Sequence, residues 1–107
     1  NVEVELSLAD LPALDGALET LQQGILSSLH SDNSLVSRDI FNSEAFLDSP
    51  RYDLLFDPQT AGGLLASVPD AHAEDCLKQL RECGYPQAKA IGRVSKTGAD
   101  LPALILK

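Results

Sequence analysis

The segment 57–63 carries the residue types best suited to chemistry. It reads Asp-Pro-Gln-Thr-Ala-Gly-Gly, so a carboxylate, an amide and a hydroxyl precede two consecutive glycines. The candidate site residues are Asp57, Gln59, Thr60, Gly62 and Gly63. Paired glycines permit positive φ and let the backbone approach a ligand closely, and successive N–H groups in such a turn can bind an anion. The segment therefore predicts a substrate or phosphate loop; the alternative is a tight turn that needs glycine only for its φ.

This loop is not a Walker nucleotide-binding loop. Leu64 and Leu65 stand where that motif has Lys followed by Ser or Thr, and the spacing G-x-G-x-x-G is also missing. Any anion would therefore be bound by backbone N–H groups and the neighbouring polar side chains.

A second group of polar residues follows Gly24. There Ser28 and Asn33 supply a hydroxyl and an amide that could line a cleft, and the alternative is a solvated loop in which both cap local turns. His30 beside Ser28 does not make a hydrolase triad, because that requires an oriented third group. The histidines and cysteines have no recognisable ligand spacing, so we expect no metal site.

Composition limits the class of protein. The chain has 107 residues, 44% of them hydrophobic, and a net charge of −8, which predicts one globular domain at 1–107. The acidic balance and scattered basic residues argue against nucleic-acid binding, and no apolar run is long enough to enter a membrane. Two cysteines, expected to be reduced core thiols, favour the cytoplasm. The start at Asn1 and the absence of Met suggest a piece of a longer protein.

Hydrophobic periodicity predicts alternating strands and helices. In chain order we expect a strand at 2–8, a helix at 13–23, a strand at 64–68, a helix at 71–83 capped by Asp70, and strands at 88–94 and 101–106. The irregular segment at 25–51 holds either a short helix at 43–49 or a functional loop. Residues 52–56 form either a short strand or a helical turn. Leu77 and Leu80 centre the apolar stripe of the late helix, so both should be core residues. This order predicts an α+β sandwich with helices packed on a mixed, mostly antiparallel sheet.

Residues 53–69 closely resemble a signature of selenide, water dikinase, also called selenophosphate synthetase, whose usual form is Asp-Pro-Gln-Thr-Ser-Gly-Gly-Leu-Leu. The segment from Pro12 to Gly24 resembles the start of the C-terminal domain of that enzyme, and Ala90 to Val94 resembles a later strand of it. One departure is Ala61, which stands where the family commonly has Ser.

The resemblance implies a partly ferredoxin-like sandwich of the aminoimidazole ribonucleotide synthetase superfamily. The full enzyme would use ATP, Mg²⁺, selenide and water to make selenophosphate, AMP and phosphate. Its catalytic residues would lie in an N-terminal ATP-binding domain, and the whole enzyme would be a homodimer. This chain would then form part of the substrate cleft, bind no cofactor tightly and be inactive alone. The alternative is a stand-alone small-molecule-binding or regulatory α/β sandwich module.

Overall fold

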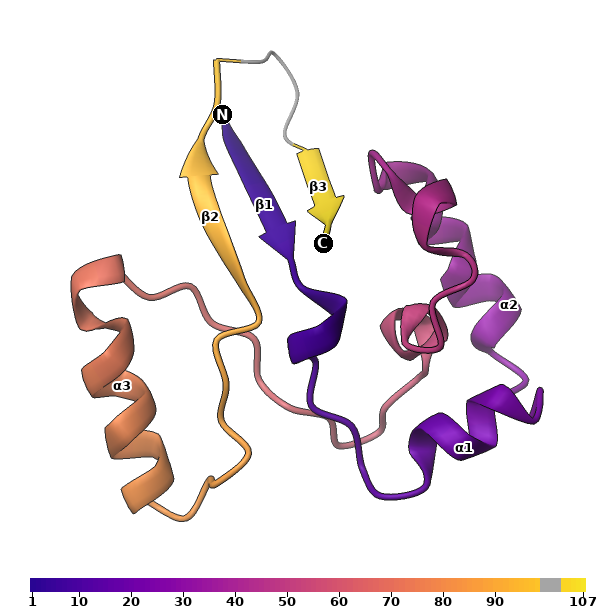
Figure 1. The fold of residues 1–107 in the computed structure, drawn as a ribbon, viewed down its shortest axis with the longest axis horizontal. Helices are drawn as coiled ribbons and strands as arrows, with labels where there is room; N and C mark the ends of the chain where they lie inside the picture. Colours follow the sequence, from indigo (N-terminus) through magenta and orange to yellow (C-terminus); the bar gives the residue numbers. More distant parts are fainter. Residues whose placement is uncertain (99–102) are drawn as a thin grey trace.

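The computed structural model describes residues 1–98 and 103–107. Its described strands form a three-stranded sheet in the order β2-β1-β3 (Figure 1). The central β1 (Val2–Leu6) pairs antiparallel with β2 (Gly92–Lys96) and parallel with β3 (Ala103–Leu106). A mixed sheet beside helices confirms the predicted α+β class, with one ladder of each direction.

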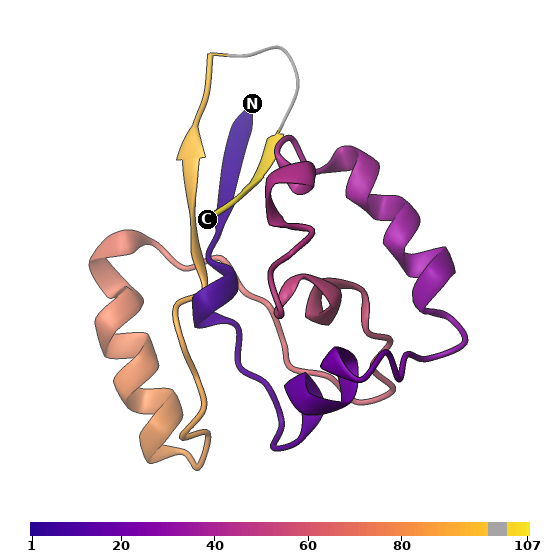
Figure 2. The same ribbon diagram turned by 45° about the vertical axis from the view of Figure 1, so that its right-hand side comes forward.

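The helices lie on two sides of this sheet. The long helix α3 (Asp70–Glu82) stands beside β2, whereas α1 (Ala17–Gln22) and α2 (His30–Asn33) lie on the side of β3 (Figures 1 and 2). Short 3₁₀ turns connect the rest of the chain: η1 (Leu8–Asp10), η2 (Ser34–Asp39), η3 (Ser43–Phe46) and η4 (Tyr52–Phe56). In the part of the chain that the structure describes, no helix is long and apolar enough to cross a membrane.

The core forms where the end of the sheet meets the 3₁₀ turns. Its buried apolar residues come from η1, from the residue after η2, from η4 and from β3; they are Leu8, Ile40, Tyr52, Phe56 and Leu106. The rings of Tyr52 and Phe56 meet edge to face, with centroids 5.1 Å apart. The core therefore joins the last strand to the polar, irregular part of the sequence.

One side chain continues the hydrogen-bonding pattern of the sheet beyond β3. Asn42 Nδ2 donates to Leu106 O at 2.9 Å, and the Leu106 N–H donates to Asn42 Oδ1 at 2.8 Å. Next to it, the Phe41 N–H donates to Leu104 O at 2.9 Å, and Ile40 forms an isolated parallel bridge with Leu104. These contacts occupy polar groups along the outer edge of β3.

The structure resolves the alternatives left open for the middle of the chain. Residues 52–56 are a helical turn, η4, and the expected short helix at 43–49 is the 3₁₀ turn η3. The helix expected at 13–23 is confirmed but shorter, and the strands expected at 88–94 and 101–106 are confirmed with shifted bounds; residues 101 and 102 lie outside the described residues.

The predicted strand at 64–68 is wrong. This segment is exposed, Leu64 fully and Leu65 to 80%, and belongs to no strand of the described sheet. A strand needs a neighbour to pair its backbone groups, and no described strand pairs with this segment. The apolar run alone could not reveal that such a partner is missing.

The predicted late helix is confirmed as α3, but its cap and its burial differ from expectation. Pro69 takes the N-cap position, so Asp70 is the first helical residue and no side chain caps the helix from the position before it. Leu80 is 38% exposed and Leu77 only half-buried, so neither is a core residue. Because α3 stands beside the edge strand β2, away from the buried cluster, its apolar stripe is only partly covered.

The cysteines follow the same pattern. Both are free, but Cys76 is half-buried on α3 and Cys83 is exposed just after it. The prediction that both are core thiols is therefore wrong.

Candidate functional site

The loop 57–63 begins directly after η4 and runs outward from the core. Asp57 is half-buried, whereas the chain from Gln59 onward is exposed. Gln59 Nε2 donates a hydrogen bond to Asp57 Oδ2, so two of the predicted site residues contact each other. The rest of the loop presents its backbone and the Thr60 side chain to the surroundings.

The glycines of this loop act differently from the prediction. Among the described glycines, positive φ occurs at Gly16, Gly24 and Gly84, so neither Gly62 nor Gly63 uses that freedom. A Cβ atom on Gly62 would lie 2.9 Å from the Cβ of Gln59, which makes this position sterically restricted. At Gly63 no described atom lies within 4 Å of such a Cβ. The fold therefore places no steric demand on Gly63.

Two of the predicted site residues meet at one cavity of about 350 Å³. Asn33 and Asp57 supply the polar part of its lining. The apolar part consists of Leu6, Val36, Ile40, Leu55, Phe56 and Leu104. Ser28 is exposed and does not line this cavity, so the structure separates it from Asn33. Gln59, Thr60, Gly62 and Gly63 likewise lie outside its lining, farther along the loop.

A side-chain hydrogen bond explains why Asn33 and Asp57 are close. Asn33 Nδ2 donates to Phe56 O at 2.9 Å, which attaches the end of α2 to the end of η4. Asp57 is the next residue along the chain. Asn33 therefore acts as a tertiary contact across the chain, and the alternative of a local cap does not describe it.

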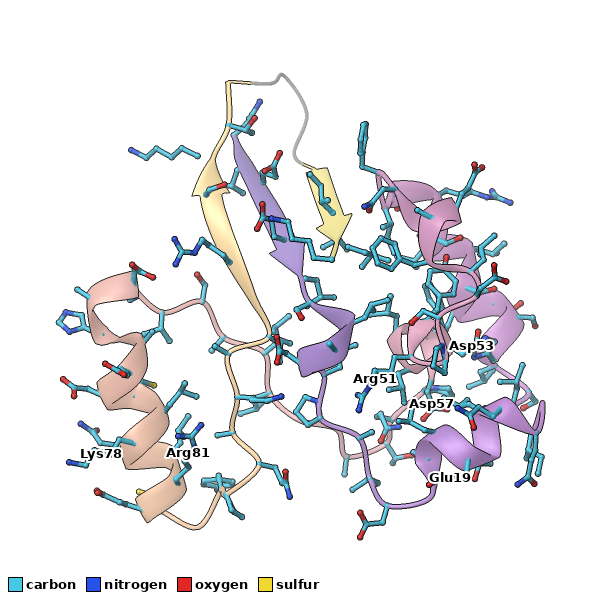
Figure 3. All side chains as sticks on the ribbon, in the orientation of Figure 1. Glu19, Arg51, Asp53, Asp57, Lys78 and Arg81 are labelled. Atoms are coloured by element: carbon cyan, nitrogen blue, oxygen red, sulfur yellow. The ribbon has the colours of Figure 1, made fainter. Side chains whose placement is uncertain are left out.

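His30 lies next to the candidate site, and its contacts were not predicted from the sequence. It is only 7% exposed, so the alternative of a solvated loop does not describe it. Its Nε2 lies 3.1 Å from Asp53 Oδ1, and its ring meets Phe56 edge to face at 6.1 Å. Figure 3 shows Asp53 and Asp57 beside α1 and α2, far from Lys78 and Arg81 of α3. The partners are 23 positions apart, so no local pattern could have indicated this pair.

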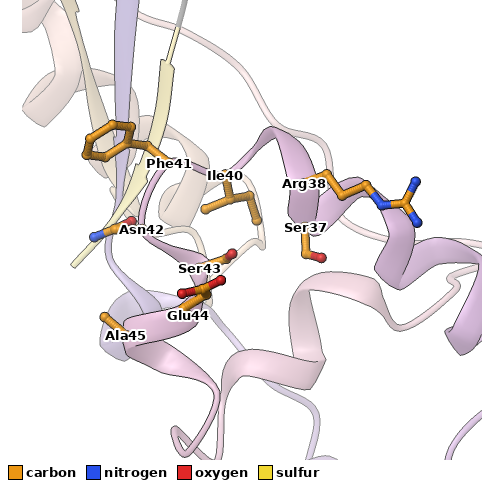
Figure 4. Close-up of a pocket in the computed structure, with 8 residues that line it drawn as sticks. All are labelled: Ser37, Arg38, Ile40, Phe41, Asn42, Ser43, Glu44 and Ala45. Carbon is orange, nitrogen blue, oxygen red and sulfur yellow. The ribbon is translucent and has the colours of Figure 1, made fainter.

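A second hollow of about 660 Å³ lies over η2 and η3 (Figure 4). Residues 37, 38 and 40–45 supply its described lining, and Arg38 and Phe41 point in opposite directions there. Because its charged and aromatic groups do not converge, we place the candidate site at the Asn33–Asp57 cavity and the loop that follows it.

The candidate site offers hydrogen-bonding groups. Exposed backbone N–H groups and the Thr60 hydroxyl can donate hydrogen bonds, and the Asp57 carboxylate can accept them. Within residues 1–98 and 103–107, no three His, Cys, Asp or Glu side chains gather as a metal site would require. The chain thus combines a small α+β fold with a glycine-rich loop beside an apolar cavity.

Sequence comparison identifies proteins that are similar to this chain. The chain is 37% identical over 102 residues to a selenide, water dikinase of Clostridium botulinum, covering 95% of this chain and 29% of that protein. Over 99 residues it is 35% identical to the selenide, water dikinase of Clostridioides difficile, covering 92% of this chain and 28% of that protein. The enzyme of the same name from Bdellovibrio bacteriovorus is 36% identical over 94 residues, 88% of this chain and 26% of that protein. No protein-family model matches the chain.

These matches confirm the resemblance drawn from residues 53–69. The chain is related to the selenide, water dikinases and corresponds to a part of them. It spans less than a third of the length of the curated relatives compared above.

Proposed function

We propose that residues 1–107 form the C-terminal domain of a cytoplasmic selenide, water dikinase. The full enzyme would make selenophosphate from selenide, ATP and water and release AMP and phosphate. Three relatives of that name, each matched over about a quarter to a third of its length, support this proposal. The partner of this domain would be an N-terminal ATP-binding domain of the same chain, in an enzyme that is a homodimer.

The role of this domain is to complete the substrate cleft. The observation that carries the proposal is the meeting of Asn33 and Asp57 at one cavity, with an exposed glycine-rich loop directly after it. Together they place a polar rim next to backbone that a substrate can reach. In this proposal Mg²⁺ and the catalytic groups would be held by the N-terminal domain.

The loop would act on the phosphoryl group through hydrogen bonds. In phosphoryl transfer, catalysis depends mostly on positioning and on donors preorganised toward developing charge. The Thr60 hydroxyl and the N–H groups of Gly62 and Gly63 are such donors, and the missing Cβ atoms let a phosphate approach the backbone. Asp57 would hold Gln59 in place through their hydrogen bond.

The decisive experiment substitutes two loop residues in the full-length enzyme. We expect Thr60→Ala to lower selenophosphate formation about tenfold to a hundredfold, because a hydrogen bond to a charged group contributes about 1.5–3 kcal/mol. Gly63→Val should also lower the rate while the melting temperature stays close to wild type, because a Cβ there meets open space. Rate and thermal unfolding are measured on the same preparations.

Gly98→Val is the matched control. A Cβ on Gly98 would also meet open space, but this glycine follows β2 and lies outside the candidate site. A normal rate in Thr60→Ala, with Gly63→Val no slower than Gly98→Val, would contradict the proposed role of the loop.

A further test separates the domain from the alternative module. The chain alone should form no AMP from ATP in the presence of selenide, because the catalytic groups would lie in the other domain. A stand-alone binding module predicts instead that the chain alone binds its small molecule tightly, which calorimetry with ATP and with inorganic phosphate would detect.

A further inference from the structure

We infer that His30 is a positioning residue that fixes the start of the substrate loop. The inference rests on the proposed function for the meaning of the loop, but its geometry is independent of that function. His30 and Asp53 join α2 to η4, and η4 leads directly into the residues that would face the substrate.

The joint between α2 and η4 has two polar contacts. His30 Nε2 and Asp53 Oδ1 lie 3.1 Å apart, and Asn33 Nδ2 donates to Phe56 O at 2.9 Å. The ring of His30 also packs edge to face on Phe56, which is buried. We call these contacts the α2–η4 brace. They hold both the start and the end of η4, and Asp57 follows that end.

A brace matters here because η4 has little internal stiffness. A 3₁₀ turn has poorer hydrogen-bond geometry than an α-helix and is stable only in short pieces. The orientation of Asp57, and of the loop beyond it, therefore depends on contacts made by neighbouring elements.

The imidazole of His30 has a chemistry that suits positioning of η4 better than simple filling of the core. Nε2 faces the Asp53 carboxylate, which can only accept, so Nε2 donates in this contact. The other ring nitrogen, Nδ1, is buried and has no hydrogen-bond partner among the described residues. An unpaired buried polar atom costs free energy that an apolar side chain of similar size would not. What the imidazole adds over such a side chain is a directional bond to Asp53.

The first test follows the loop itself by two-dimensional amide NMR spectra of this chain. Asp53→Ala removes the hydrogen-bond partner of His30. Asp53 is the more exposed residue of this pair, with its side chain 46% exposed. We expect the backbone amides of residues 57–63 and the side-chain amide of Asn33 to change chemical shift, while the amides of β1 and β2 keep theirs. The imidazole ring stays in this variant, so loss of the ring itself is not the cause of such changes.

Two histidine variants complete the series. His30→Phe keeps the ring on Phe56 but loses the donor, and should displace the same resonances as Asp53→Ala. His30→Gln retains an N–H donor and should return them toward wild-type positions. His72→Phe is the matched control, because His72 is an exposed histidine on α3. If His30→Phe does not fold, Asp53→Ala decides the question.

A merely structural role gives a different result. The melting temperature would fall, but at temperatures where the variants are folded the amides of residues 57–63 would coincide with wild type in both Asp53→Ala and His30→Phe. That outcome overturns the inference.

The second test measures kinetics in the full-length enzyme. His30→Phe should lower kcat/KM about tenfold to a hundredfold, the effect of misplacing a substrate contact by about an ångström, and His30→Gln should recover part of it. If the Thr60 and Gly63 variants lower the rate while the His30 variants do not, the inference fails and the proposed function stands. If the brace variants displace the loop but no loop variant changes the rate, the proposed function fails and the brace remains.

Discussion

The contact between Asn42 and Leu106 gives the sharpest stability prediction. Asn42→Ala removes one side chain that binds both backbone groups of a residue in β3, through bonds of 2.9 and 2.8 Å. Leu106 is 1% exposed, so water has poor access to those groups after the substitution. The variant therefore leaves a donor and an acceptor unpaired at the edge of the sheet.

The size of the effect follows from the number of bonds. Each ordinary hydrogen bond contributes about 0.5–1.5 kcal/mol net, and leaving a buried group unpaired costs about 1–3 kcal/mol. The loss of two bonds whose remaining groups water reaches poorly predicts a loss of about 2–3 kcal/mol in the free energy of unfolding. Asn42→Asp should also destabilise at neutral pH, because it loses the donor and places a carboxylate beside the Leu106 carbonyl.

Urea unfolding followed by far-ultraviolet circular dichroism measures this loss. With a slope of about 1–3 kcal/mol per molar urea, the midpoint for Asn42→Ala should fall by roughly 1 M or more. Gln22→Ala, which truncates an exposed amide on α1, is the control and should stay within about 0.5 kcal/mol of wild type. A loss below about 0.5 kcal/mol in Asn42→Ala would refute the reasoning.

Three further predictions concern stability. Gly92→Ala should cost about 1–3 kcal/mol in urea unfolding, because its Cβ would overlap a backbone carbonyl of β1. Leu80→Ala should cost less than about 1 kcal/mol by the same assay, since that side chain is 38% exposed, and a loss of about 2–5 kcal/mol would show a fully buried site. Hydrogen bonding to Ser7 and the charge of Lys89 lower the pKa of Asp10 from its usual 3.8. Asp10 therefore stabilises the fold above that pH and loses this contribution as pH falls through its lowered pKa; Asp10→Asn should flatten acid unfolding curves in this range.

Sequence periodicity predicted the helices, which satisfy their backbone hydrogen bonds within their own residues. The helix α3 follows from its apolar stripe and from Gly84 just past its end, although the predicted cap, Asp70, is its first residue. The same stripe could not show what covers it, and Leu80 is accordingly more exposed than predicted. Segment 64–68 failed for a related reason, because a strand depends on a partner edge elsewhere in the chain.

The middle of the chain was the least predictable. Residues 34–56 hold three 3₁₀ turns, whose short length gives no hydrophobic period to detect. Their main contacts are distant in sequence: Asn42 binds a residue 64 positions away. The sequence drew attention to Asn33 and Asp57, and both line the same cavity. It could not indicate that His30 is buried, because its partner belongs to another turn.

The order of synthesis gives the sheet a particular vulnerability. The central strand β1 is translated before both of its partners, which come from residues 92–106. A nascent chain that stops before β3 leaves backbone N–H and C=O groups along one edge of β1 unpaired, and it lacks Leu106, the most buried residue of the core. Ribosomal stalling or a premature stop in the last few codons of this segment should therefore yield an unfolded, protease-sensitive product. The sheet forms only after nearly all of the described chain has left the ribosome, because the partners of β1 come from its far end. Pairing them closes a long loop, which costs conformational entropy and slows folding.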